Sequence, residues 1–216
     1  MRKYGMMSAV VLMLLAAFVL TGCQKPPEQE QGVAQQALEA AKQAEAEKYA
    51  QTELSAVQAT LDQAKSEIET QKAKWMPKYE KAKELLAQAK TQADQAKEAA
   101  IANKEKAKTE ATQAINDAKA AVAAAKESLG KAPKGGKGTK VDIEQFTKDL
   151  DGYTASITEA ESMMQKEDFF GARDKAKQAM DGAKNVQTQL DEVIAKMAEK
   201  KHGPAHKAAA KPAHKK

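Results

Sequence analysis

The chain has 216 residues, of which 30% are charged and only 4% are aromatic. Alanine, lysine, glutamate and glutamine dominate, no segment alternates apolar and polar residues as a strand does, and the composition favours helix over sheet. The single cysteine excludes an internal disulfide. The formal net charge is +5, and residues 196–216 alone contain seven lysines against one acidic residue, so the basic character lies in the tail.

The first 22 residues have the pattern of a lipoprotein signal peptide. A basic pair at positions 2 and 3 precedes an apolar run over residues 9–20, which has the length of a signal-peptide core and is too short to span a membrane. The sequence L-T-G-C at residues 20–23 resembles a bacterial lipobox. We therefore expect residues 1–22 to be removed and Cys23 to carry the lipid. An ordinary secretory signal followed by a chance cysteine is the alternative.

Residues 23–32 are polar, contain two prolines and are predicted to tether the lipid to the folded part. Several acyl chains on Cys23 would hold the protein stably to a membrane. Gln24 is not the aspartate that is associated with retention at the inner membrane. The expected location is therefore the outer membrane, facing the periplasm.

Residues 33–129 are predicted to form an alanine-rich helical hairpin. Apolar residues at positions 54, 57, 61, 64, 68 and 75, with Gln71 in the gap, alternate spacings of three and four, which predicts one helix over residues 33–74. Pro77 disfavours helix in the residue before it, so residues 74–76 are predicted to be a turn and residues 77–129 a second helix. One kinked continuous helix is the alternative. Trp75 and Tyr79 are interpreted as packing residues of the turn.

The predicted second helix would be about 75 Å long at ~1.5 Å per residue. Its apolar stripe is mostly alanine, so partner helices can approach closely, although each contact buries little area. The part beyond Ala100 has no partner of equal length in the first helix. It must pair with later helices, pair with another chain, or remain marginal.

The rest of the chain divides into a linker, a second hairpin and a tail. Residues 130–140 are rich in glycine and lysine and are predicted to be a flexible linker. Residues 141–200 again show three-four spacing, with Asp168 as a predicted N-cap between two helices. Residues 201–216 contain lysine, histidine, alanine and proline, and are predicted to be disordered. The expected fold class is all-α: long antiparallel hairpins or coiled coil, a flexible linker and a disordered basic tail.

The two predicted hairpins share a spacing pattern. Tyr79 is followed by apolar residues 3, 7, 10 and 14 positions later, and so is Phe169. Each aromatic residue comes directly after a predicted turn. Duplication of one helical hairpin would produce this pattern, and so would shared heptad geometry alone.

Residues 34–100 carry a resemblance to a known class of protein. The pattern comprises Y-A-Q-T-E-L at residues 49–54, Leu61, A-K at residues 64–65, and Tyr79 with A-K at residues 82–83. It resembles the alanine-rich envelope lipoproteins of Gram-negative bacteria that carry a helical domain of unknown function. The resemblance implies a lipidated periplasmic helical protein with no known activity. A weaker analogy is to the major murein lipoprotein, which also ends in lysine, but the linker and second hairpin depart from that small protein.

No catalytic or cofactor motif occurs in the sequence. The chain lacks a P-loop, a dinucleotide fingerprint, G-x-S-x-G and H-E-x-x-H, so we expect neither enzymatic activity nor a cofactor. His202, His206 and His214 are the only histidines, and Gly203-Pro204 breaks the helix that would pair the first two. They predict weak metal affinity at most and no functional metal site.

The basic tail predicts binding to an anionic surface. Its candidate residues are Lys200, Lys201, Lys207, Lys211, Lys215 and Lys216. Because export removes nucleic acid as a partner, the expected targets are peptidoglycan carboxylates, lipopolysaccharide phosphates or phospholipid head groups. A merely solubilising tail is the alternative. Two functions fit the sequence: a lipid-anchored spacer or tether between membrane and cell wall, or a helical binding module for another envelope protein or a second copy of the chain.

Overall fold

The computed structural model describes residues 25–132 and 139–202, and the side chains of residues 25–132 and 143–198. Within these ranges every regular element is an α-helix, so the all-α prediction is confirmed. The helices are α2 (Glu28–Gln43), α3 (Ala46–Tyr49), α4 (Gln51–Lys72), α5 (Glu80–Lys131), α6 (Thr139–Gln165) and α7 (Phe169–His202). None of the described helices is both long and apolar enough to cross a membrane. The predicted signal peptide at residues 1–22 and Cys23 lie outside the described residues.

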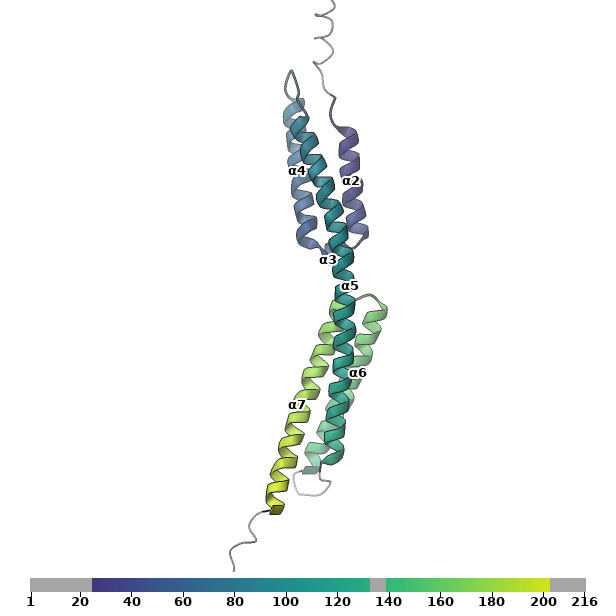
Figure 1. Ribbon diagram of the computed structural model, residues 1–216, viewed down its shortest axis with the longest axis vertical. Helices are drawn as coiled ribbons and strands as arrows, with labels where there is room; N and C mark the ends of the chain where they lie inside the picture. Colours follow the sequence, from purple (N-terminus) through teal and green to yellow (C-terminus); the bar gives the residue numbers. More distant parts are fainter. Residues whose placement is uncertain (1–24, 133–138, 203–216) are drawn as a thin grey trace, which may run out of the picture. The chain divides into compact units, whose positions relative to one another are not determined.

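The chain divides into two compact units, one up to Glu105 and one from Lys106. The boundary lies within α5, whereas the sequence placed the division at the linker of residues 130–140. The reason is that each half of α5 packs with different helices: its first half with α2 and α4, and its second half with α6 and α7 (Figure 1).

Unit 1 consists of α2, α4 and the first half of α5. Helices α2 and α5 run parallel, because Glu30 near the start of α2 lies 3.6 Å from Lys83 near the start of α5, and Glu45 after the end of α2 pairs with Lys104 further along α5. Helix α4 is antiparallel to both, because it leads the chain from the end of α2 back to the start of α5 (Figure 1). Its buried side chains are mainly large, whereas α2 and α5 bury mostly alanine.

The predicted single helix over residues 33–74 is wrong. The chain leaves the helix at Glu45, whose φ of 62° is left-handed, and again at Ala50, whose φ and ψ of −144° and 46° are not helical. Partners on α5 support this break: Lys104 pairs with the Glu45 carboxylate, and the Asn103 side chain donates a hydrogen bond of 2.8 Å to the Tyr49 carbonyl. Residues 28–72 therefore supply two long helices to the unit instead of one.

The chain does turn between α4 and α5, so the alternative of one kinked continuous helix is also wrong. Helix α4 ends at Lys72 and α5 begins at Glu80, and the predicted turn at residues 74–76 lies in this connection. The second predicted helix, over residues 77–129, corresponds closely to α5.

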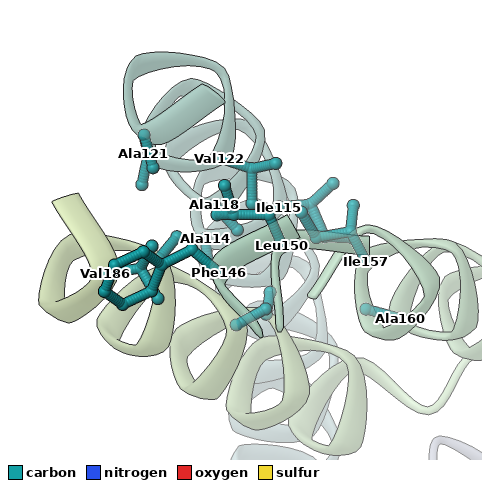
Figure 2. Packing of buried hydrophobic residues seen from close by; sticks show 14 of the residues in the cluster. Ala114, Ile115, Ala118, Ala121, Val122, Phe146, Leu150, Ile157, Ala160 and Val186 are labelled. Carbon is teal, nitrogen blue, oxygen red and sulfur yellow. The ribbon is translucent and has the colours of Figure 1, made fainter. Parts of the chain in front are cut away.

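Unit 2 consists of the second half of α5 with α6 and α7, packed around one apolar cluster (Figure 2). Lys119 of α5 pairs with Glu161 of α6 at 2.6 Å, and Arg173 of α7 pairs with Glu110 of α5 at 3.2 Å. The far part of α5 thus finds its partners in the later helices, which was one of the three arrangements that the sequence left open. The large members of the cluster include Phe146, Leu150, Ile157, Val186 and Leu190.

In unit 2 the connection between α5 and α6 differs from the prediction, whereas the connection between α6 and α7 matches it. Gly130 and Lys131 belong to α5 and α6 begins at Thr139, so the linker predicted over residues 130–140 is too long. A glycine is tolerated at the last turn of a helix, where its backbone cost is small. Asp168 caps α7 as predicted, because its Oδ1 accepts a hydrogen bond of 3.4 Å from the Gly171 amide.

The shared spacing pattern after Tyr79 and Phe169 corresponds to equivalent positions in the two units. In each unit a buried aromatic residue stands at the start of the third long helix, as its first residue in α7 and directly before it in α5, and buried residues follow 3, 7, 10 and 14 positions later. The basic residue four positions after each aromatic, Lys83 or Arg173, pairs with a glutamate of the unit's first helix, Glu30 or Glu110. The two units therefore share one topology.

Two glycines provide a matched test of the packing in unit 2. A Cβ added to Gly152 in α6 would meet nothing within 4 Å, whereas one added to Gly182 in α7 would lie 2.3 Å from Tyr153 Cζ. Gly152→Ala should raise the free energy of unfolding by about 0.5–1 kcal/mol, because alanine is the better helix former. Gly182→Ala should gain less or lose stability, since the Tyr153 ring must move. Urea unfolding followed by circular dichroism measures both.

The control is Gly182→Ala in a Tyr153→Ala background, where the gain should return. Equal gains for Gly152→Ala and Gly182→Ala in the parent chain would contradict the packing of Tyr153 against Gly182.

Candidate functional site

The residues that the sequence predicts to be functional lie outside the described side chains. Cys23 and the tail residues His206, His214, Lys207, Lys211, Lys215 and Lys216 lie outside the described residues. Lys200, Lys201 and His202 belong to the last turn of α7, but their side chains are outside the description. Among the described residues, no group of three or more histidine, cysteine, aspartate or glutamate side chains could hold a metal ion.

The most unusual surface of the described chain is the connection between α4 and α5, residues 73–79, which we call the tip. Its Trp75 side chain is 93% exposed and its Met76 side chain is 57% exposed. Tyr79, which ends the tip, is buried. The prediction that both aromatic residues pack in the turn is thus right for Tyr79 and wrong for Trp75, because the chain directs Trp75 outward and leaves no helix face to cover it.

The tip is held in place by a buried amide at the end of α4. Gln71 Oε1 accepts a hydrogen bond of 3.1 Å from the Lys78 amide, and Gln71 Nε2 donates one of 2.7 Å to Glu67. The Gln71 carbonyl also accepts a hydrogen bond of 3.0 Å from the Lys74 amide. These hydrogen bonds hold the backbone of the tip at Lys74 and at Lys78. The path of the backbone between them leaves Trp75 exposed.

The tip is surrounded by positive charge. Residues 72–81 contain four lysines and one glutamate, and Lys72, Lys74 and Lys78 are all exposed. Lys72 Nζ donates a hydrogen bond of 2.7 Å to Glu69, which raises the pKa of Lys72 above its ordinary value; desolvation partly offsets this rise, and the charge of Glu69 adds to it. Lys72 is therefore cationic at neutral pH.

The start of α2 lies at the same end of unit 1 as the tip (Figure 1). Two observations support this placement: the charge of Glu28 acts on Lys72 at the end of α4, and Glu30 pairs with Lys83 in the first turn of α5. A shallow groove of about 470 Å³ lies between the start of α2 and Lys83 in the first turn of α5, and is lined by Lys25, Pro26, Pro27, Glu28, Gln29, Glu30 and Lys83. The first described residue, Lys25, therefore enters unit 1 beside the start of α5.

Two further grooves flank α2. One, of about 330 Å³, separates α2 from α5 and has the half-exposed Val33 at its edge and Leu86 and Ala87 on its other side. The other, of about 290 Å³, opens beside Gly32 and reaches Leu61 of α4. Aliphatic side chains, amides, glutamates and lysines line both grooves.

The comparisons with known proteins yield no relative. No family model, no curated protein and no solved structure matches the chain.

Sequence reasoning missed the tip as a surface feature. The signal that could have found it is the run K-W-M-P-K at residues 74–78, in which two large apolar residues stand between lysines. Trp75 continues the three-four spacing of residues 54–71, so periodicity alone favoured its burial.

Substitutions at Gln71 and at Trp75 should differ in their effect on the free energy of unfolding. Gln71→Ala should lower the free energy of unfolding by about 1 kcal/mol, because it leaves the Lys78 amide without its acceptor. Trp75→Ser should change it by less than about 0.5 kcal/mol, since a 93% exposed side chain contributes little to packing. Thermal and urea unfolding of both variants measure this. A larger loss for Trp75→Ser than for Gln71→Ala would contradict the outward position of Trp75.

Proposed function

We propose that the protein is a non-enzymatic, lipid-anchored helical protein of the bacterial envelope that acts as a spacer or tether between the outer membrane and the cell wall. The observation that carries the proposal is the L-T-G-C sequence at residues 20–23 followed so closely by a folded helix: α2 begins at Glu28, five residues after Cys23. A lipid on Cys23 would attach unit 1 to the membrane by a tether of about 18 Å at most, given ~3.6 Å per extended residue.

The helical body supports a structural role. Its buried seams consist largely of alanine at three-four spacing, which is typical of coiled-coil pairing. Its outward faces carry ion pairs and intrahelical hydrogen bonds, as in Lys90 with Asp94 at 2.6 Å and Lys131 with Glu127 at 2.7 Å. Such faces are solvated surfaces. Proteins built in this way provide length and contact surface.

The tail supports the tethering part of the proposal. Its lysines, in residues 196–216, lie in the last turns of α7 and beyond it, whereas Cys23 precedes α2, the first described helix. One end of the chain would thus be held by lipid and the other by peptidoglycan carboxylates or lipopolysaccharide phosphates. The second candidate function is a binding module for a helix of another envelope protein, and the half-exposed Val33 beside the groove between α2 and α5 favours it.

Replacement of the lipidated cysteine tests the anchor. Cys23→Ala should leave the chain unprocessed or release it from the membrane fraction, because no other cysteine can accept the lipid. Metabolic labelling with a palmitate analogue, together with fractionation of the envelope, measures both effects. Gln24→Ala is the matched control and should remain acylated. A Cys23→Ala protein that is still processed, acylated and bound to membrane would refute the proposal.

Deletion of the tail separates the two candidate functions. The protein lacking residues 201–216 should no longer bind isolated peptidoglycan or lipopolysaccharide, and binding of the intact protein should weaken steeply with salt, since exposed charges are screened beyond ~8 Å at physiological ionic strength. Sedimentation with purified peptidoglycan at several salt concentrations measures this. If the truncated protein binds equally well, the helices are the binding surface and the binding-module function replaces the tether.

A further inference from the structure

The tip is longer than the connection between two helices needs to be. In unit 2 the equivalent turn, between α6 and α7, uses three residues, and in unit 1 the tip uses seven. Each turn leads into a third long helix that runs parallel to the first helix of its unit, with a buried aromatic residue as its first residue in α7 and directly before it in α5. The additional residues in unit 1 are those that carry Trp75 and Met76. The fold does not require them, so their presence needs a separate explanation.

The chemistry of the tip matches the boundary between lipid headgroups and acyl chains. Tryptophan has a large apolar ring with one polar N–H, which suits it to the interface between headgroups and hydrocarbon. Methionine is apolar and flexible. The exposed lysines at residues 72, 74 and 78 flank these two residues in the sequence and can contact anionic headgroups.

The tip is also placed where a membrane would be. The start of α2 lies at the same end of unit 1, and Cys23 is five residues before it (Figure 1). A chain held by a lipid at that point keeps this end of unit 1 within about 18 Å of the membrane surface. The tether thereby raises the local concentration of the tip at the membrane, so a weak contact becomes occupied.

We propose that the tip inserts Trp75 and Met76 into the headgroup region of the membrane that holds the lipid anchor, with the surrounding lysines on anionic headgroups. The inference rests on the proposed function for the position of the membrane. The insertion gives unit 1 a second attachment to the membrane beside its lipid. The end of unit 1 that carries the tip is then held at the membrane surface and does not move freely on the tether.

A membrane explains the tip better than a protein partner does. A specific protein interface buries about 800 Å² on each side, which is several times the area that two side chains supply. The side chains around Trp75 and Met76 are exposed lysines, which are depleted at the centres of protein interfaces. A lipid surface needs neither a large patch nor a complementary pocket.

The single tryptophan and the single cysteine permit a direct test. The chain of residues 23–216 is coupled through Cys23 to a maleimide-bearing lipid in vesicles of phosphatidylcholine and phosphatidylglycerol, which supplies the tether whether or not the native protein is acylated. Emission from Trp75 should shift to shorter wavelength, and brominated acyl chains should quench it. Quenching of Trp75 by iodide should be several-fold weaker than in the chain coupled to a soluble maleimide. The mass of the native protein separately reports acylation of Cys23, so failure of the anchor and failure of the tip are distinguished.

Two controls locate the contact. In a Trp75→Phe background, Ile101→Trp moves the probe to another exposed apolar position of unit 1, and its iodide quenching should not change on coupling to vesicles. The pair Lys74→Gln and Lys78→Gln should restore much of the iodide quenching of Trp75, whereas Lys97→Gln with Lys108→Gln should not. All variants retain the basic tail, so the tail does not account for the difference.

The inference is overturned if Trp75 in tethered vesicles is quenched by iodide as strongly as in the soluble chain. It is also overturned if lipid alone gives no protection and an envelope protein fraction does, because the tip is then part of a protein interface. Circular dichroism of each variant verifies the fold, and the outward position of the substituted side chains makes their replacement compatible with it.

Discussion

Close approach of helices at alanine is the constraint on which both units depend. Ala82, Ala89 and Ala93 in α5 and Ala172, Ala176 and Ala179 in α7 are fully or almost fully buried, each on the face that meets the other two helices. An alanine seam gains little hydrophobic free energy for each residue, so the helices must approach closely to gain dispersion energy and must be long to accumulate it. The large residues are concentrated on α4 and α6, where Leu54, Leu61, Leu150 and Ile157 fill the space that the alanines leave.

Charge and backbone geometry then fix the ends of the helices. Lys83 and Arg173 occupy the same position in their units, and each holds the third helix to a glutamate of the first. Glu45 and Glu167 occupy the same backbone region, with φ of 62° and 58°, at points where the chain must leave a helix. Left-handed geometry is unfavourable for glutamate. At Glu45, the ion pair with Lys104 contributes to offsetting this cost.

The spacing of apolar residues predicted most of the fold, and the predictions that were wrong have physical reasons. The three-four spacing identified the buried faces of α4, α5, α6 and α7, and Asp168 was recognisable as a cap because its side chain acts locally. The break at Glu45 was not visible, because glutamate, lysine and alanine continue through residues 40–50 and all favour helix; the break depends on Asn103 and Lys104, more than fifty residues away. The exposure of Trp75 was missed for a related reason: an aromatic residue beside a proline fits a packed turn, and only the path set by Gln71 directs it outward.

The position of the tryptophan changes what the fluorescence of this protein reports. In most proteins, tryptophan emission follows unfolding because the ring moves from the interior into water. Here the only tryptophan is already 93% exposed in the native state, so denaturation leaves its surroundings almost unchanged. Unfolding changes instead the surroundings of Tyr49 and Tyr79 in unit 1, which are 5% and 2% exposed, and of Tyr153, which packs against the apolar cluster of unit 2. Tyrosine and tryptophan signals from one sample thus report separate events, the folding of the helical units and the occupancy of the tip.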